Sequence, residues 1–386
     1  MDFERHNEEV KRGWEAFEAG RPIRVPVLFN FNTRYFILNP AINAEGVSLR
    51  DYFNSPDLMF EFQLRSERWL RLNVPMDAEM GWPKAWHGIR GDGIRVDFQN
   101  VYEAAWFGCQ IVFIDGDVPT TLPMLRENKT RLYDLEIPDP LHDGLMATAL
   151  EYFQHFQEKA QGFEFEGRPV AEIAVPMGTD GPFTVACNLR GTTELCLDLY
   201  EDPQYVHDLI SFVTEGIIQR IKAWAELAGL RVPLVGWKFA DDSIELLSPG
   251  MYWEFVLPYH KRLVEVISEG PRSIHLCGKA QHLFKIMWDE LNVHAFETGF
   301  PTNLAQARRE LGLDVLLIGN IHPELLRSGP EERIEAAVRE LLASGVTEGG
   351  RFILADGHNV APGTPVRHLE TMYLAGKKYG QYRREG

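Results

Sequence analysis

The feature that most constrains the fold is a regular alternation of short apolar runs and helical spans, clearest between residues 273 and 323. Apolar runs near 272–276, 293–297 and 314–318 each end in polar residues, and a helical span leads from one run to the next. This alternation is typical of parallel strands joined by crossover helices. The stretch therefore predicts a parallel α/β fold whose functional residues lie at the carboxyl ends of its strands.

Further apolar runs continue the pattern on both sides of this stretch. The eight strand candidates are 25–30, 110–114, 169–176, 232–239, 272–276, 293–297, 314–318 and 351–355. Eight alternating strand-helix units predict one closed (β/α)8 TIM barrel. An open doubly wound sheet is the alternative, but no Gly-x-Gly-x-x-Gly follows the first strand, so a dinucleotide-binding fold lacks its best support.

The chain length of 386 residues suits one large barrel with insertions, and we expect a single domain over 1–386. Residues 1–24 are expected to form an N-terminal helical extension. Segment 75–128 is rich in tryptophan, glycine and proline, and its fold is harder to assign. We interpret it as an elaborated insertion that could act as a lid, because long insertions in compact domains are usually functional or mobile.

Charge and cysteine content limit the class of partner. The formal net charge of −17 argues against nucleic acid or an anionic membrane as the main partner. The four cysteines include no Cys-x-x-Cys pair, so the sequence indicates no disulfide framework. The first residues lack the apolar core of a signal peptide, and no apolar run approaches the ~20 residues that span a bilayer. We therefore expect a cytoplasmic enzyme with a small-molecule substrate.

Closure of the barrel would bring polar residues from distant parts of the sequence to one mouth. These residues are Asn30, Asn32, Arg34, Asp241, Asp242, His275, Cys277, Glu297, Asn320, His322 and His358. Of the adjacent acids at 241 and 242, we expect one to face the pocket and the other to form a cap or a salt bridge. Arg34 could hold a substrate carboxylate in a bidentate manner, or be a solvated surface arginine.

The most specific pattern in this set is His275-Leu-Cys277. Side chains at i and i+2 of a strand share one face, so His275 and Cys277 can bind one ligand. Zinc takes imidazole, thiolate and carboxylate ligands, and Glu297 and His358 at other strand ends are candidates for the remaining positions. The alternative is that His275 is a hydrogen-bonded barrel histidine and Cys277 a small buried apolar residue.

Several short motifs together resemble one known family, the uroporphyrinogen decarboxylase superfamily. The motifs are Gly181-Pro-Phe-Thr184, Asp202-Pro203, Asp241-Asp242, Phe255-Val-Leu-Pro258-Tyr259, His275-Leu-Cys277-Gly278, Gly319-Asn320-Ile-His-Pro323 and Gly357-His358-Asn359-Val-Ala-Pro362-Gly-Thr-Pro365. The superfamily includes the decarboxylase and the zinc-dependent, corrinoid-linked methyltransferases. Its fold is a (β/α)8 barrel, which agrees with the strand count.

Two places distinguish the branches of this superfamily. The decarboxylase carries an Arg-Gln-Ala-Gly-Arg-Tyr loop after the first strand, and of that loop only Arg34-Tyr35 matches here. The methyltransferases carry His-x-Cys, which matches His275 and Cys277, and a late Cys that aligns with His358. Since histidine is an acceptable zinc ligand, the resemblance implies a site of His275, Cys277 and His358, with Glu297 as a further ligand.

The resemblance therefore implies a zinc-dependent methyltransferase that moves a methyl group between a small substrate and a cobalamin (corrinoid) carried by a partner protein. Expected catalytic residues are Asp241, Glu297 and His358, and expected substrate-binding residues are Asn32, Arg34, Tyr35, Asp242 and Asn320. The alternatives are a cofactor-free carboxy-lyase and a corrinoid- or tetrapyrrole-binding barrel without catalysis. A homodimer is also expected, because members of both branches often associate.

Overall fold

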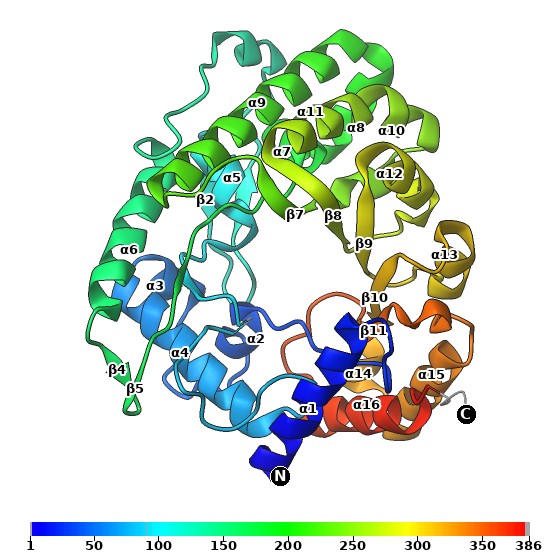
Figure 1. Ribbon diagram of the computed structural model, residues 1–386. Helices are drawn as coiled ribbons and strands as arrows, with labels where there is room; N and C mark the ends of the chain where they lie inside the picture. Colours follow the sequence, from blue (N-terminus) through cyan, green and yellow to red (C-terminus); the bar gives the residue numbers. More distant parts are fainter. Residues whose placement is uncertain (1, 90, 383–386) are drawn as a thin grey trace.

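A five-stranded parallel sheet forms the centre of the computed structural model, which describes residues 2–89 and 91–382 (Figure 1). The neighbouring strands, in spatial order, are β11 (Phe352–Asp356), β10 (Leu316–Ile321), β9 (Val293–Thr298), β8 (Ser268–Leu276) and β7 (Leu234–Ala240). Each strand thus lies beside its neighbour in the sequence, as helical crossovers require. The predicted α/β class with parallel strands is confirmed.

Buried apolar side chains hold these strands in the sheet, as in sheets covered by helices. All five residues of β11 are buried, and Ile274 in β8 and Phe296 in β9 are fully enclosed. The register places His275 of β8 directly opposite Ala240 of β7 on one side and Glu297 of β9 on the other. Polar residues at the carboxyl ends of neighbouring strands therefore lie at the same level.

Shorter strand segments continue this arrangement beyond the central sheet. Val27 forms a parallel bridge with Leu354 of β11, and β1 (Ile94–Arg95) pairs in parallel with β6 (Ile173–Ala174). On the other side of the sheet, the Ala240 amide of β7 donates to the carbonyl of Thr179, which follows β6. The first predicted strand region therefore lies beside the eighth, and the chain after the third lies beside the fourth, as a barrel-like order requires.

One strand prediction needs correction. Residues 110–114 do not join the parallel sheet, because β2 (Gln110–Val112) pairs antiparallel with β3 (Thr120–Leu122) in a hairpin. Gly116 in the connecting turn has a φ of +74°, a conformation that suits glycine. The strand that pairs in parallel with β6 is β1, and we did not predict β1 from the sequence. A second hairpin joins β4 (Glu164–Phe165) to β5 (Arg168–Pro169).

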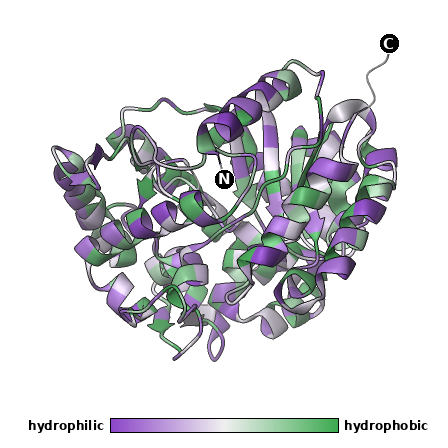
Figure 2. Cartoon of the chain, turned by 90° about the horizontal axis from the view of Figure 1, so that it is seen from below, coloured by the Kyte–Doolittle hydropathy of each residue, from purple (hydrophilic) through white to green (hydrophobic). Residues whose placement is uncertain are grey.

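The helices lie outside the strands and carry both hydrophilic and hydrophobic residues (Figure 2), and their buried residues are mainly apolar. They are α1 (Phe3–Glu18), α2 (Thr33–Ile37), α3 (Leu49–Phe53), α4 (Pro56–Asn73), α5 (Tyr102–Trp106), α6 (Gly144–Ala160), α7 (Pro182–Arg190), α8 (Thr192–Glu201), α9 (Pro203–Leu227), α10 (Pro249–Phe255), α11 (Leu257–Ile267), α12 (Phe284–Leu291), α13 (Leu304–Leu311), α14 (Pro323–Ser328), α15 (Glu331–Leu342) and α16 (Val366–Tyr379). Among the described residues, no helix combines the length and apolar character needed to cross a bilayer.

The N-terminal helix α1 is fixed to the closing helix α16 and to the chain around Asp77. Glu9 of α1 forms an ion pair of 2.6 Å with Lys377 of α16 and one of 3.3 Å with Arg24. Arg24 in turn donates two hydrogen bonds of 2.6 Å to the carboxylate of Asp77. The segment expected as an N-terminal extension is therefore tied to the rest of the fold (Figure 1).

Segment 75–128 is part of the body of the protein. Trp86, Ile94 and Trp106 are buried, and β1 lies within this segment. A lid that opens would need few buried apolar contacts. The segment supplies walls to the cavities described below, and its possible role as a lid stays a prediction.

Candidate metal centre

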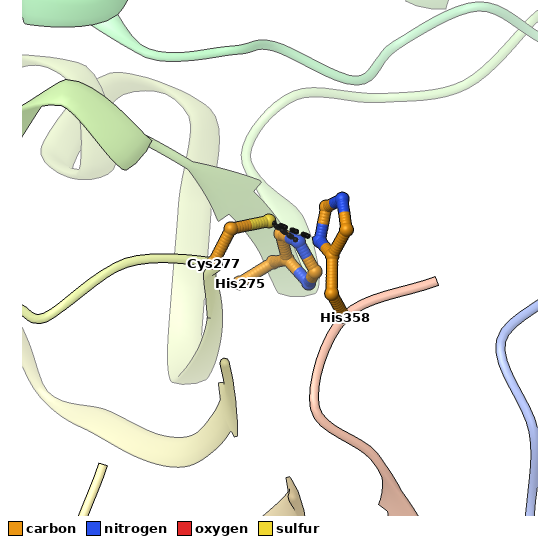
Figure 3. A group of neighbouring side chains, drawn as sticks. All are labelled: His275, Cys277 and His358. Carbon is orange, nitrogen blue, oxygen red and sulfur yellow. Dashed lines mark hydrogen bonds between the residues drawn. The ribbon is translucent and has the colours of Figure 1, made fainter. Parts of the chain in front are cut away.

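His275, Cys277 and His358 meet in one cluster at the carboxyl end of the sheet (Figure 3). The sulfur of Cys277 lies between two imidazoles, 2.8 Å from Nε2 of His275 and 2.7 Å from Nδ1 of His358. All three potential ligand atoms lie within 4.8 Å of one another. The structure thus brings together three of the four residues that the sequence analysis named as metal ligands.

Backbone hydrogen bonds hold the two loops that supply this cluster. The amide of Cys277, directly after β8, donates to the Asp242 carboxylate at 2.7 Å. On the other side, the amide of Gly357, directly before His358, donates to the carbonyl of Ile321 at 2.8 Å. Burial raises the pKa of the neighbouring Asp356 to about 8, and its Oδ1 accepts from the amide of Asn30 at 2.8 Å. The cluster is therefore positioned by the main chain of three separate strand ends.

Glu297 lies behind His275, on the side of the ring away from Cys277. Its Oε2 is 3.2 Å from Nδ1 of His275 and also forms an ion pair with Lys238. A carboxylate at Nδ1 fixes the tautomer that leaves Nε2 free to bind a metal. Glu297, which the sequence predicts as a further ligand, thus lies outside the three-residue cluster and contacts His275 and Lys238.

The surroundings of the cluster change the proton affinity of its members. Burial, and then the negative charge of Asp242, raise the pKa of the Cys277 thiol well above its ordinary value. Burial and the positive charge of Arg34 lower the pKa of His358. Burial alone would raise the pKa of Glu297, but the hydrogen bond from His275 and the charge of Lys238 outweigh it and hold that pKa low. Without a metal, Cys277 is thus a neutral thiol beside a neutral His358.

The donor set suits zinc. Catalytic zinc sites in proteins use three side-chain ligands, often imidazole and thiolate, and keep one position open for water or substrate. His275, Cys277 and His358 supply two imidazole nitrogens and one sulfur, and Glu297 adds the carboxylate that commonly supports a zinc-bound histidine. Soft sulfur and imidazole together select zinc over magnesium or calcium, which prefer oxygen ligands.

The cluster opens into a cavity of about 300 Å³, which we call the metal chamber. Its polar walls include Asn30, Asn32, Arg34, Asn100, Tyr102, Asp180, Lys238, Asp242, Glu297 and Asn359, together with the three residues of the cluster. Of the residues predicted to bind substrate, Asn32, Arg34 and Asp242 therefore face this chamber. A small molecule that enters it would contact both the cluster and several amide side chains.

Asp241 lies behind the wall of the metal chamber. Its side chain is 0% exposed, and its carboxylate accepts from the amides of Phe183 and Thr184 and is 2.9 Å from Nε2 of His260. The carboxylate thus binds the first turn of α7, where the helix dipole favours a negative charge. We expected Asp241 to contact substrate, but its carboxylate is enclosed by the protein and positions the start of α7.

Two further expected substrate contacts are also occupied within the protein. The hydroxyl of Tyr35 is buried and donates to the carbonyl of Thr364 at 3.0 Å. The side-chain amide of Asn320 is buried and donates to the carbonyls of Gly299 and Thr302 at 3.1 and 2.7 Å. Both residues hold loops near the site and do not line the metal chamber.

Two ionisable residues of this chamber were not identified from the sequence. Lys238 is a charged residue inside the apolar run Val235-Gly-Trp-Lys-Phe239, and this contrast could have identified it as a site residue. Asp180 stands in Gly178-Thr-Asp-Gly181, a glycine-rich turn directly before α7. The sequence of a turn does not predict which way its side chains point, so only the fold shows that Asp180 lines the cavity.

The chain is similar in sequence to two known methyltransferases. The chain is 26% identical over 290 residues to a methylated-thiol–coenzyme M methyltransferase of Methanosarcina mazei, covering 74% of this chain and 72% of the relative. It is also 26% identical over 302 residues to the methylcobamide:CoM methyltransferase MtbA of Methanosarcina mazei, covering 77% of this chain and 83% of the relative.

The fold agrees with these relatives. A solved methyltransferase from Methanosarcina mazei superposes with a TM-score of 0.67 at 20% identity, over 96% of this chain and 98% of that one. The sequence profile described as "Uroporphyrinogen decarboxylase (URO-D)" matches residues 84–379. The family resemblance inferred from the short motifs is thereby confirmed, and the chain is an enzyme. It belongs to the uroporphyrinogen decarboxylase (URO-D) family.

Proposed function

We propose that this enzyme is a zinc-dependent methyltransferase that moves a methyl group between a small substrate and a corrinoid carried by a partner protein. One observation carries the proposal: the Cys277 sulfur lies within 2.8 Å of a nitrogen from each of two histidines that come from separate strand ends. The two relatives from Methanosarcina mazei, both named as methyltransferases and one as acting on methylcobamide, support the same reaction class.

The residues of this chain have separate tasks in the proposed reaction. His275, Cys277 and His358 would hold the zinc ion, and Glu297 keeps Nε2 of His275 directed at it. A bound zinc ion supplies Lewis acidity, which lowers the pKa of a thiol at its open position. Asp242 fixes the backbone of Cys277, and Arg34 places a positive charge in the metal chamber.

The decarboxylase reaction fits this site less well. A porphyrinogen with several carboxylates needs several cationic partners. Among the described residues, the metal chamber presents Arg34 and Lys238 as its arginine and lysine side chains, and Lys238 already pairs with Glu297. A cofactor-free carboxy-lyase would also have no need for a sulfur between two imidazoles.

The proposal is tested with zinc-loaded enzyme, free methylcobalamin as methyl donor and ethanethiol as acceptor. The thiolate sulfur attacks the methyl carbon, and the carbon–cobalt bond breaks with both electrons left on cobalt. We expect the absorbance of methylcobalamin to fall as ethyl methyl sulfide forms, and we expect a strong chelator to stop the reaction.

Two cysteine variants make this test specific. Cys277→Ser should lose the reaction, while Cys196→Ser, a half-buried cysteine on α8 outside the metal chamber, should keep it. Full activity of Cys277→Ser, or full activity after chelation with no zinc left in the protein, would rule out the proposed function.

A further inference from the structure

A second cavity of about 300 Å³ adjoins the metal chamber, and we call it the side chamber. Five residues line both cavities: Asn32, Asn100, Tyr102, Gly178 and Asp180. The two spaces therefore meet along a common boundary, and a molecule bound at the metal centre has the side chamber next to it.

The side chamber lies between β1, β6 and α6, and 10 of its 20 lining residues have apolar side chains. Phe31, Phe98, Met146 and Met177 are among its lining residues. An apolar cavity of about 150 Å³ is large enough to bind benzene. A volume of about 300 Å³ therefore accommodates an aromatic ring or a short hydrocarbon chain with room for a linker.

Two charged groups of the side chamber, Asp97 and Arg95, already have partners within the protein. The carboxylate of Asp97 accepts from Thr33 Oγ1 at 2.7 Å, from the Tyr52 hydroxyl at 3.2 Å and from Gln99 Nε2 at 2.7 Å. The guanidinium of Arg95 is bonded to Asp92. A sulfonate or carboxylate in this chamber would have to compete with these bonds, whereas an uncharged apolar group would not.

Asp180 stands at the boundary between the two chambers and is held in place from behind. Its backbone amide donates to Glu103 at 2.7 Å, and Glu103 pairs with the buried Arg220 at 2.8 Å. Burial, and then the charges of Glu103 and Asp242, raise the pKa of Asp180 well above its ordinary value. The raised pKa favours the protonated form of this carboxyl group at the boundary.

We infer that the side chamber binds the apolar body of the methyl-accepting or methyl-donating substrate while its reactive heteroatom lies at the metal centre. This inference rests on the proposed function and names its substrate class. The substrate is a thiol, or the corresponding methyl thioether, that carries an uncharged ring or hydrocarbon chain. A compact anionic thiol would leave the side chamber unused.

Binding of three probe thiols to zinc-loaded enzyme, measured by isothermal titration calorimetry, tests this inference. The probes are ethanethiol, 2-phenylethanethiol and 2-mercaptoethanesulfonate. Burial of the phenyl ring should make 2-phenylethanethiol bind about tenfold more tightly than ethanethiol or more. The sulfonate should bind less tightly than 2-phenylethanethiol, because it leaves the side chamber unused.

Variants that fill the side chamber show where the ring binds. Ala174 on β6 lines this chamber and is half-buried, so Ala174→Leu should remove most of the preference for 2-phenylethanethiol and leave the ethanethiol affinity unchanged. Ala149→Leu on α6 fills the same chamber from another side and serves if the first variant folds poorly. Ala228→Leu, the same substitution outside both chambers, is the control and should behave as wild type.

The outcomes separate this inference from the proposed function. Equal affinity for ethanethiol and 2-phenylethanethiol, binding of the sulfonate at least as tight as that of 2-phenylethanethiol, or a preference that survives both leucine variants would overturn the inference and leave the methyltransferase proposal standing. Failure of the zinc-loaded enzyme to bind any of the three thiols would overturn both.

Discussion

At the scale of single residues, the surroundings of Cys277 suit a metal ligand whose thiol gives up its proton when the metal binds. Its sulfur contacts His275 and His358, and burial beside Asp242 keeps it protonated when no metal is bound. A buried neutral thiol is a poor nucleophile, since the thiolate is the reactive form. Cys277 is therefore better suited to binding a metal than to attacking a substrate directly.

This protonation state predicts that zinc affinity depends on pH. The raised pKa of Cys277 means that zinc displaces a proton from the thiol at neutral pH, whereas the lowered pKa of His358 leaves its imidazole already neutral. The apparent affinity should therefore rise up to about tenfold per pH unit between roughly pH 6.5 and pH 8.5. Competition with a chromophoric chelator measures it, and an affinity independent of pH would contradict this account.

The carboxylate of Glu297 gives a second test at this scale. In Glu297→Gln the side chain keeps its size but loses the charge that supports Nδ1 of His275, so zinc affinity should fall by about 10- to 100-fold. Glu290→Gln, which alters a half-exposed carboxylate paired with Lys261, is the matched control and should bind zinc as wild type does. Chelator competition distinguishes the two, and equal affinities would mean that Glu297 gives His275 no support.

At the scale of elements, the segment between β6 and α7 is fixed by a buried ion pair. Arg220 of α9 donates to Glu103 at 2.8 Å and to the carbonyl of Pro176 at 3.0 Å, and both charged side chains are almost fully buried. Glu103 in turn accepts from the hydroxyl of Thr179 and the amide of Asp180. One helix thus holds the boundary between the two chambers in place.

Removal of one partner from this pair should be costly. Arg220→Met leaves the Glu103 carboxylate buried without its counter-charge, and the free energy of unfolding should fall by about 3–5 kcal/mol. Arg262→Met, which removes the arginine of an exposed pair with Glu215, should cost about 1 kcal/mol or less. Urea denaturation followed by circular dichroism measures both, and similar losses would show that burial of the pair is unimportant.

The elements also show which parts of the site and the fold could be predicted from the sequence. His275, Cys277 and His358 were predictable, because strand periodicity puts His275 and Cys277 on one face and parallel strands end at one edge. The role of Glu297 was not, since sequence spacing places it beside His275 but does not say which ring nitrogen it faces. Periodicity also could not tell that Asp241 turns toward α7, or that residues 110–112 pair with their own hairpin partner.

At the scale of the whole molecule, the site depends on parts of the chain that are far apart in sequence. Asn30 donates to Asp356 across 326 residues, and Cys277 contacts His358 across 81. The metal chamber and the side chamber adjoin near these strand ends, so one substrate can reach both. Only the complete fold provides this arrangement, which is why the side chamber could not be anticipated from short motifs.

The measurement that tests the central claim most directly is the zinc content of the purified protein, determined by elemental mass spectrometry beside Cys277→Ser and Cys196→Ser. The two variants make the same substitution, one inside the cluster and one on α8. We expect about one equivalent of zinc in wild type and in Cys196→Ser, as a three-ligand site binds one ion, and almost none in Cys277→Ser. Wild-type protein that binds no zinc when it is supplied, or Cys277→Ser protein that retains a full equivalent, would contradict the account.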